Sequence, residues 1–445
     1  MNGDVTVIGG GLAGLVAAAR LAEAGADVTL YERRPEVGGR VRTETVDGFT
    51  LDRGFQVLFT SYPAVASELD TDALDVRRFA PGATICRPGS RSTLSDPLRD
   101  PRGAIPSLLN DEVSFSDKLR TLALRYDLSN RDEDDFFAGR DDSSGGPDDA
   151  SIREYLRDWG FADDYVEHFV EPFYGGITLD RSLSTSKQVF EYTFRAMGRG
   201  AIGVPAEGMS TIPESLAARA REAGVAIETG EDVESVRTAG KGRIPFQSGS
   251  ADADGATVEL ADGATRETDA VVVAASPPEA RRLTGVESVP TEGVPNVTGW
   301  YALPAGESFG TGKRILLNAA NESPNAVVPM SEVAPEYAPD DRALLAATFL
   351  GEDSLDREDE ELCSDVRGAL EAWFPERDFE GLETLDVHRI RFAQFAQPPG
   401  VHAELPDPDD PEGPVTLAGD YTEWSSIQGA LESGRNAAAA AAEYL

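Results

Sequence analysis

Three glycines near the start of the chain, Gly9, Gly11 and Gly14, have the spacing of a loop that binds the pyrophosphate of a dinucleotide. In such a loop the first glycine permits a tight turn, the second lets the phosphates approach the backbone, and the third lets a helix pack closely on a strand. Glu32 follows at the distance at which an acidic side chain accepts hydrogen bonds from a ribose. These residues and spacings predict a dinucleotide-binding site.

The sequence around the glycines indicates the elements that position them. A short apolar strand over residues 5–8 precedes the loop, and an alanine-rich helix extends from it to about Ala24. A second strand follows and ends at Glu32. The backbone N–H groups at the start of the helix would then face the phosphates.

Gly38, Gly39 and Arg40 come directly after the second strand. The two glycines permit close backbone approach, and a guanidinium can pair with phosphate. Together with the sequence LDRGF over residues 51–55, this arrangement resembles the flavin-containing amine oxidase superfamily, which includes amine oxidases, protoporphyrinogen oxidases and carotene desaturases. The resemblance implies FAD as the cofactor, with NAD as the minor alternative.

Length and composition bound the class of protein. A chain of 445 residues exceeds what one hydrophobic core usually organises, so we expect two domains. Acidic residues outnumber basic residues 79 to 40, which gives a net charge of −39 spread along the sequence. We interpret this excess as solubility in a very salty, halophilic cytoplasm, with binding of partners through acidic residues as the alternative. The charge argues against nucleic-acid binding.

The cysteines, histidines and apolar segments indicate the compartment of the protein and argue against a metal site and a membrane span. Cys86 and Cys363 lie far apart and form no CxxC pair, which indicates a reducing compartment; with three scattered histidines, they also predict no metal site. No uninterrupted apolar run reaches about 18 residues, so we expect no membrane span. The N-terminal apolar stretch lacks a basic leader and is interpreted as core. We expect a cytoplasmic protein, and contact of an apolar rim with a membrane surface stays open.

Residues 54–65 mix aromatic with small side chains and resemble the same stretch of plant and cyanobacterial phytoene desaturases. In that family the stretch passes close to the flavin ring, so the resemblance assigns Gly54, Phe55 and Gln56 to the cofactor site. Gln56 stands where that family usually has histidine. A buried strand and turn is the structural alternative.

Residues 79–204 differ in composition from the flanking segments. Apolar residues recur at helical spacing, which predicts a run of amphipathic helices, including one over residues 96–109 and one that starts near Ser182. An acidic, glycine-rich stretch over residues 131–150 interrupts them and is interpreted as a solvated loop. We expect this insert to form a helical cap over the flavin.

The dinucleotide domain is expected to resume near Pro205. Residues 225–230 and 232–236 are predicted to form a strand pair, and in the superfamily a valine at the place of Val233 contacts the adenine ring through its backbone. The buried strand that ends beside Ala275 resembles the element that returns the chain to the flavin.

Residues from about 295 to 397 alternate strands with a helix and are assigned to the sheet of the second domain. Trp300 and Tyr301 are candidates for the wall of a cavity, with plain core packing as the alternative.

The end of the chain carries a second strong signal. A short strand ends at Gly419 and Asp420, and a helix begins near Ser425 with Gly429 and Ala430 in its first turns. Asp420 would accept hydrogen bonds from ribityl hydroxyls. The N–H groups of the helix start would stabilise negative charge on a reduced flavin. This stretch resembles the C-terminus of plant-type carotene desaturases.

These observations predict an α/β fold with a Rossmann-type FAD-binding domain of three layers (β-β-α) and a second, α+β domain that binds substrate. The expected FAD-binding domain comprises residues 1–78, 205–290 and 411–445, and the second domain comprises the helical insert 79–204 and the sheet 291–410. The residues expected around the cofactor are Gly9, Gly11, Leu12, Ala13, Gly14, Glu32, Arg33, Gly38, Gly39, Arg40, Gly54, Phe55, Gln56, Val233, Ala275, Gly419, Asp420, Ser426, Ile427, Gly429 and Ala430.

Two departures from the amine oxidases narrow the implied chemistry. Those enzymes generally carry a lysine, linked through water to flavin N5, on a strand that matches residues 296–304, where this chain has Thr298 or a neighbour. No lysine lies between Lys241 and Lys313. The amine oxidases also place a tyrosine of an aromatic cage where this chain has Ser426.

The sequence therefore predicts an FAD-dependent oxidoreductase that moves hydride between flavin N5 and a C–H bond of a small, largely apolar substrate, as a desaturase or isomerase of carotenoids or other isoprenoids. No side chain stands out as a general base. The sequence does not identify the electron acceptor, and a quinone and oxygen both stay open. The alternatives are an amine or protoporphyrinogen-type oxidase that uses oxygen, and a non-redox FAD-binding scaffold or lipid carrier.

Overall fold

A computed structural model describes residues 3–95, 99, 113–137, 149–238, 255–306, 308–321 and 323–445 of the chain. Its first sheet has five parallel strands in the order β10-β2-β1-β14-β20. The strand AVVV over residues 270–273 is a continuous buried apolar run, as expected inside a parallel sheet covered on both faces, whereas the edge strand AIET over residues 226–229 is mostly exposed. The bounds of the five strands are β1 (Asp4–Ile8), β2 (Asp27–Glu32), β10 (Ala226–Thr229), β14 (Ala270–Val273) and β20 (Val415–Leu417).

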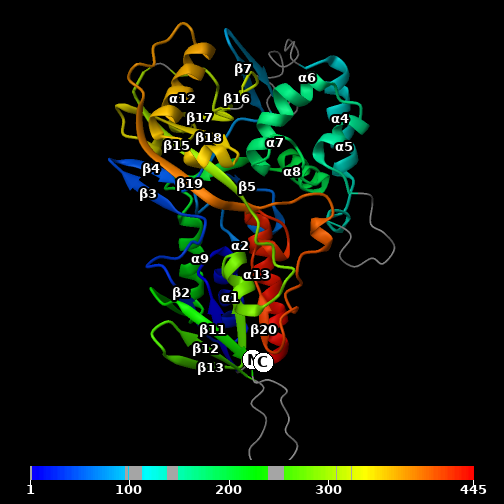
Figure 1. Cartoon of the computed structure of the whole chain (residues 1–445), viewed down its shortest axis with the longest axis vertical. Coiled ribbons are helices and arrows are strands. Elements are labelled where there is room, and N and C mark those ends of the chain that lie inside the picture. Colours follow the sequence, from blue (N-terminus) through cyan, green and yellow to red (C-terminus); the bar gives the residue numbers. More distant parts are fainter. Residues whose placement is uncertain are drawn as a thin grey trace, which may run out of the picture.

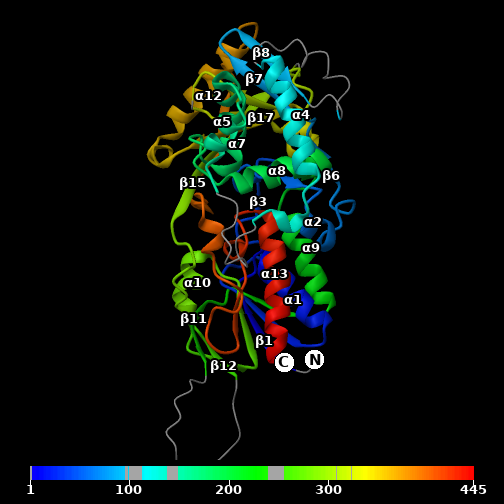
Figure 2. The same cartoon turned by 90° about the vertical axis from the view of Figure 1, so that its right-hand side faces the viewer.

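Two different layers cover this sheet (Figures 1 and 2). On one face Val7 and Val272 pack with helices α1 (Leu12–Glu23), α9 (Thr211–Glu222) and α13 (Ile427–Ala441). On the other face Ile8 and Val271 pack with an antiparallel sheet of β11 (Val233–Thr238), β12 (Ala256–Leu260) and β13 (Thr265–Thr268). The expected three-layer arrangement of a Rossmann-type domain is confirmed.

The strand pair expected over residues 225–230 and 232–236 is wrong. β10 extends the parallel sheet beside β2, whereas β11 pairs with β12 in the covering sheet. A turn at Gly230 separates the two strands, and each finds its partner in a distant segment. Short apolar strands do not reveal their partners, because pairing is set by the tertiary fold.

The second sheet has seven strands in the order β19-β15-β18-β17-β16-β7-β8 and forms the opposite end of the molecule from the termini (Figure 1). Alternate residues of β15 serve its two faces: Tyr301 packs under helix α12, and Trp300 packs in the core on the other side. The bounds are β7 (Ala83–Arg87), β8 (Ser90–Leu94), β15 (Gly293–Pro304), β16 (Ile315–Asn318), β17 (Ala326–Pro329), β18 (Arg342–Leu350), β19 (Glu383–Phe395) and α12 (Asp359–Trp373).

A group of helices covers the face of this sheet opposite to α12, which we call the inner face (Figure 2). They are α4 (Phe115–Ser129), α5 (Ile152–Asp158), α6 (Asp163–Tyr165), a π-helical turn over Val166–Val170, α7 (Glu171–Thr178) and α8 (Lys187–Arg199). The helix expected near Ser182 is α8, which begins only at Lys187, because Ser186 caps it by accepting the N–H of Gln188 at 3.1 Å.

The periodicity of segment 79–204 predicted a run of helices, but part of the segment forms strands. β7 and β8 form a hairpin that joins the seven-stranded sheet, with β7 parallel to β16. The helix expected over residues 96–109 and residues 138–148 of the expected acidic loop lie outside the described residues, apart from Arg99. In the described part, no helix is both long enough and apolar enough to cross a bilayer.

The remaining elements include a two-stranded sheet, β3-β4, and a three-stranded sheet in the order β5-β9-β6. The bounds of these remaining elements are β3 (Thr43–Val46), β4 (Phe49–Asp52), β5 (Leu58–Phe59), α2 (Pro63–Glu68), β6 (Val76–Arg78), β9 (Ile202–Pro205), α10 (Pro277–Thr284) and α11 (Met330–Val333). The five-stranded sheet takes its strands from residues 4–32, 226–273 and 415–417, and the seven-stranded sheet from residues 83–94 and 293–395. The exact domain boundaries expected from the sequence stay a prediction.

Candidate functional site

A cavity of about 760 Å³ runs between the two sheets. One end is lined by the loops that follow β1, β2 and β14 and by the start of α13, and we call this end the dinucleotide half. The other end is lined by residues between Val57 and Ile202 and between Asn296 and Gln397, and we call it the apolar half. All expected cofactor residues except Gly14 and Gly429 line this cavity.

Two glycine turns form a cradle at the carboxyl ends of β1 and β2. The N–H of Gly38 donates to the carbonyl of Gly10 at 2.7 Å, which brings the second turn onto the first. A Cβ atom on Gly39 would lie 3.2 Å from the Cα of Gly11. The backbone is thus bare where a pyrophosphate would pass at the start of α1.

Glu32 closes the adenosine side of the cradle. Its carboxylate accepts the N–H of Gly10 at 2.7 Å and the N–H of Arg34 at 2.9 Å, and the side chain is largely buried. A carboxylate has about four acceptor positions, so lone pairs remain for the hydroxyls of a ribose. The position at the end of β2 agrees with the role that the spacing predicts, which stays a prediction.

Arg40 and Asp420 meet at the centre of the cavity wall. They form an ion pair, and the hydroxyl of Ser425 donates to the other carboxylate oxygen of Asp420 at 2.9 Å. Helix α13 begins beside them, with Ser426 as its cap accepting the N–H of Gly429 at 2.8 Å. The positive end of the helix dipole therefore faces the cavity.

Gly14 and Gly429 serve packing rather than the cavity surface. A Cβ atom on Gly14 would lie 2.0 Å from the carbonyl oxygen of Gly9, and one on Gly429 would lie 2.1 Å from that of Trp424. The third glycine of the motif thus lets α1 pack on β1, as the spacing predicts. The main-chain carbonyl of Val233 already accepts a bond from Arg282 at 3.2 Å, so that oxygen is engaged within the protein.

The segment Gly54–Gln56 is held by the other domain. The N–H of Gly54 donates to Nδ1 of His388 at 3.2 Å, and the N–H of Phe55 donates to Oγ1 of Thr298 at 3.2 Å. Gln56 donates to the carbonyl of Arg53 at 3.2 Å. Two strands of the seven-stranded sheet therefore fix the backbone that forms the junction of the two cavity halves.

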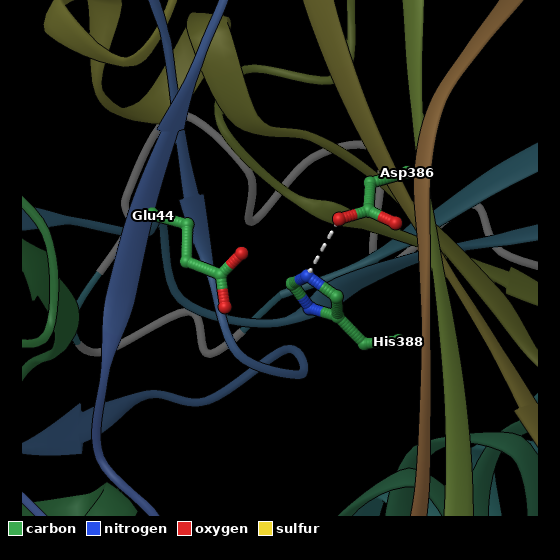
Figure 3. Close-up of side chains that lie close together, drawn as sticks. All are labelled: Glu44, Asp386 and His388. Carbon is green, nitrogen blue, oxygen red and sulfur yellow. Dashed lines mark ion pairs between the residues drawn. The ribbon is translucent and has the colours of Figure 1, made fainter. Parts of the chain in front are cut away.

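Behind this backbone, Glu44, Asp386 and His388 lie together, with one ligand-type atom of each within 4.8 Å of the others (Figure 3). Nε2 of His388 lies 3.3 Å from Asp386. Because Nδ1 accepts the N–H of Gly54, the proton of the neutral ring sits on Nε2 and faces Asp386. A metal on Nε2 would leave the ring proton on Nδ1, facing the N–H of Gly54, so the hydrogen bond to Gly54 and a metal at this nitrogen are alternatives.

Asp52 lies under the same junction and is almost completely buried. Its carboxylate accepts bonds from the hydroxyl of Thr43 at 2.6 Å, the N–H of Met209 at 2.8 Å and the hydroxyl of Tyr337 at 3.0 Å. Burial raises the pKa of Asp52 to about 6 despite these bonds. The side chain joins β4, the start of α9 and the segment after α11.

The apolar half is built mainly from aromatic and aliphatic side chains. Phe169 and Phe173 stack with their centroids 5.4 Å apart, and Phe190 and Phe194 stack at 5.6 Å. Among the described residues that line this half, none is an aspartate or a glutamate. Its charged side chains are the basic Arg99, Lys118 and Arg125.

Trp300 and Tyr301, the expected wall candidates, do not line the cavity; both are core residues of β15. The residues that sequence reasoning missed are Asn296, Thr348 and Ile390, which do line it. The alternation of β15 places residues 296, 298 and 300 on one face and could have indicated this face. The partners on β18 and β19 could not be read from the sequence.

The chain is similar to known flavin-dependent proteins. The family model described as flavin containing amine oxidoreductase matches residues 12–442. A carotenoid 3,4-desaturase of Haloarcula japonica is 26% identical over 301 residues, which cover 63% of this chain and 57% of that protein. The match therefore spans little more than half the length of that relative.

Solved structures share the whole fold. An oxidoreductase from Methanosarcina mazei has a TM-score of 0.73 at 19% identity and covers 97% of this chain and 99% of its own. A putrescine oxidase with bound putrescine has a TM-score of 0.68 at 20% identity, with coverage of 99% and 98%. At these identities the likeness concerns the fold alone.

Proposed function

The chain belongs to the flavin containing amine oxidoreductase family, and on that premise we propose that it desaturates or isomerises a polyene or another largely apolar isoprenoid. Its cofactor is FAD, and the protein is an FAD-dependent oxidoreductase. The bare glycine cradle, the partly free carboxylate of Glu32 and the start of α13 fit the pyrophosphate, ribose and flavin ends of this cofactor.

The observation that carries the proposal is the absence of carboxylates from the described lining of the apolar half. An amine substrate enters as a cation, and a buried cation without a counter-ion is costly. A hydrocarbon chain has no such requirement and gains from burial against the stacked phenylalanines. The cavity therefore suits an apolar substrate better than an amine.

The residues of the chain bind and orient rather than transfer protons. Histidine is absent from the described lining of the cavity, and its lysine, Lys118, lies on α4 at the far end from the cradle. When bound, FAD would supply the acceptor for a hydride from a C–H bond of the substrate, and the proton lost from the neighbouring carbon as the double bond forms would pass to solvent. We propose a quinone or oxygen as the final electron acceptor.

The name of one similar protein supports an isoprenoid rather than an amine as the substrate. The relative from Haloarcula japonica carries the name of a carotenoid desaturase, whereas the putrescine oxidase shares only the fold. The resemblance to amine oxidases implies a lysine near residues 296–298. This chain has Asn296 and Thr298 there, on β15, and the strand contains no lysine.

We also propose that the substrate enters from a lipid surface. Phe115, Leu119, Leu122 and Tyr126 follow one stripe of α4, and each exposes 45% or more of its surface. Phe115, Leu119 and Leu122 also line the cavity, so this stripe forms its rim. Large exposed apolar stripes of this kind mark contact surfaces.

Liposome flotation in high salt tests the entry route. The wild type should float with zwitterionic vesicles, and a Leu119→Ser, Leu122→Ser variant should not. Tyr444→Ser, which removes an exposed apolar side chain 43% accessible at the opposite end, is the control and should float like the wild type. Flotation of the α4 variant at the wild-type level would contradict the route.

An anaerobic titration tests the proposed reaction. The FAD-loaded protein is mixed with a polyene in detergent micelles at high salt, and the oxidised-flavin band near 450 nm should bleach as the polyene loses two hydrogen atoms, followed by mass spectrometry. Peroxide release with a panel of amines, but no bleaching by polyenes, would favour an amine oxidase instead. Binding of FAD and polyene without bleaching or isomerisation would indicate a non-redox carrier.

A further inference from the structure

A row of polar side chains crosses the otherwise apolar inner face of the seven-stranded sheet. Thr298 of β15 lies in register with Thr348 of β18 on one side and with His388 of β19 on the other. Asn296 precedes Thr298 by two residues and therefore points to the same face. Cross-strand neighbours on one face lie within side-chain contact, so these four residues form one cluster.

The two members of the cluster that line the cavity each have a polar atom without a hydrogen-bond partner among the described residues. Oγ1 of Thr298 accepts the N–H of Phe55 at 3.2 Å and the side-chain N–H of Asn296 at 3.0 Å. Within the part of the chain that the structure describes, Oδ1 of Asn296 and Oγ1 of Thr348 contact no hydrogen-bonding group. Asn296 is 6% exposed and Thr348 is 5% exposed, and both line the cavity.

Buried polar atoms are normally satisfied, so a pair of orphaned atoms on a cavity wall indicates a bound polar group. The carboxamide oxygen of Asn296 only accepts, whereas the hydroxyl of Thr348 both donates and accepts. An alcohol hydroxyl offers both roles that these atoms require, a donor for the carboxamide oxygen of Asn296 and an acceptor for the hydroxyl of Thr348. A carbonyl oxygen would leave Asn296 unsatisfied, and an ammonium would find no carboxylate among the described residues that line this half.

We propose that Asn296 and Thr348 form a subsite for a hydroxyl group on the apolar substrate. This inference rests on the proposed function and specifies its substrate class: an isoprenoid alcohol rather than a pure hydrocarbon. A Cβ atom on Gly54 would lie 3.7 Å from Nδ2 of Asn296, so the subsite lies at the junction of the two cavity halves. The hydroxyl therefore anchors the end of the chain nearest the dinucleotide half and selects the bond that reacts.

A matched pair of polyenes tests the subsite in the FAD-loaded protein. The probes are lycopene and the alcohol made by hydrating one of its terminal double bonds, each titrated from detergent micelles by quenching of protein fluorescence. The wild type should bind the alcohol about fivefold to tenfold more tightly than the hydrocarbon, the gain expected from one or two buried hydrogen bonds.

The variants separate the subsite from general packing. Thr348→Val and Asn296→Leu keep the side-chain volume and should bring the ratio of the two dissociation constants to about one. Thr84→Val is the matched control, because Oγ1 of Thr84 is also buried and unpartnered but lies on β7 away from the cavity lining. It should leave the ratio at its wild-type value.

The outcomes distinguish the inference from the function on which it rests. Equal binding of both polyenes by the wild type overturns the subsite and leaves the proposed function intact. Binding of neither polyene overturns the proposed function and the subsite with it. A Thr348→Val protein that keeps the wild-type ratio but shows a shifted flavin spectrum would assign these atoms to the cofactor and also overturn the subsite.

Discussion

The two halves of the cavity differ in their carboxylates: the dinucleotide half contains buried carboxylates with partners, and the described lining of the apolar half contains none. In the dinucleotide half, Glu32 is held by two backbone N–H groups and Asp420 by Arg40 and Ser425. In the apolar half the described lining contains no carboxylate, and its few buried polar atoms are partly unsatisfied.

The comparison shows that, in the described lining of the cavity, buried carboxylates occur only where backbone N–H groups or an arginine compensate their charge. The chain's net charge of −39 resides mostly on the exposed surface, where water and salt screen repulsion. Inside the molecule a carboxylate without partners would raise its pKa or destabilise the fold. The described lining of the apolar half, which has basic but no acidic side chains, therefore offers no counter-ion to a cation.

Placing a carboxylate in the apolar half should give the largest effect. Leu317 is 1% exposed and lines the cavity on β16. We expect Leu317→Glu to lower the free energy of unfolding at pH 7 by about 4–5 kcal/mol, because the buried charge has no partner. Urea unfolding measures the loss, and the charge contribution is the difference from Leu317→Gln, which should shrink as pH falls and the glutamate is protonated. Equal losses for both variants at pH 7 would contradict the comparison.

Removing a compensated charge should give the next largest effect. The side chain of Glu68 is fully buried and pairs with Arg20, with Arg219 at 2.7 Å and with Arg435 at 3.6 Å. We expect Glu68→Gln to cost about 3–4 kcal/mol, since three arginines lose their shared partner. Thermal and urea unfolding measure it. The control is Glu383→Gln, which breaks an exposed pair with Arg342 and should change stability by less than about 0.5 kcal/mol.

The pH dependence of Glu68 follows from the same partners. Burial raises the pKa of Glu68, but the hydrogen bonds and charges of Arg20 and Arg219 outweigh it and hold the pKa below its ordinary value. The ion cluster therefore contributes its full stability above about pH 4.5 and loses it as the pH falls through the lowered pKa. The difference between wild type and Glu68→Gln should disappear in acid.

Asp52 has hydroxyl and amide partners and should show the opposite sign. Its pKa is raised to about 6, so its favourable contribution is complete below about pH 4 and is lost as the pH rises to about 6. Asp52→Asn removes this titration. The hydroxyl proton of Tyr337, now shared between Asp52 at 3.0 Å and the carbonyl of Pro205 at 3.1 Å, can then go to Pro205 while the asparagine N–H donates to the hydroxyl oxygen. We expect the variant to gain about 2–3 kcal/mol over wild type between pH 4 and 7. Urea unfolding at several pH values measures this gain. A difference in the free energy of unfolding between wild type and Asp52→Asn that does not change between pH 4 and 7 would contradict the raised pKa of Asp52.

The sequence predicted the parts of the site that short spacings encode. The glycine motif, Glu32 and the Gly419–Asp420 turn lie within single loops, and their positions around one cavity agree with the family and the cofactor, which are confirmed. Their contacts with FAD stay predictions. Local spacing fixed these elements because each loop joins a strand directly to the next element of the same sheet.

The apolar half could not be predicted in the same way. Its floor depends on the register of Thr298 with Thr348 and His388, residues that are 50 and 90 positions apart from it in the chain. The hairpin β7–β8 joins this sheet beside β16, which comes more than 200 residues later. Such pairings depend on the whole tertiary fold, so alternation within one strand indicated a face but not its neighbours.

The smallest expected effect comes from a single methyl group in the dinucleotide half. Gly11 has a φ angle of −77°, and a Cβ atom there would meet only the Cα of Gly39 at 4.0 Å, so the fold accepts alanine. The methyl group would nevertheless occupy the gap where the pyrophosphate approaches the backbone. We expect Gly11→Ala to weaken FAD binding by about tenfold, or about 1.4 kcal/mol, in a titration of flavin absorbance. Gly368→Ala, whose Cβ would meet open space on α12, is the control and should bind FAD like the wild type. Because the methyl group lies in one half of the cavity, polyene affinity should stay unchanged; a Gly11→Ala protein with wild-type FAD affinity would show that the phosphates do not pass through this cradle.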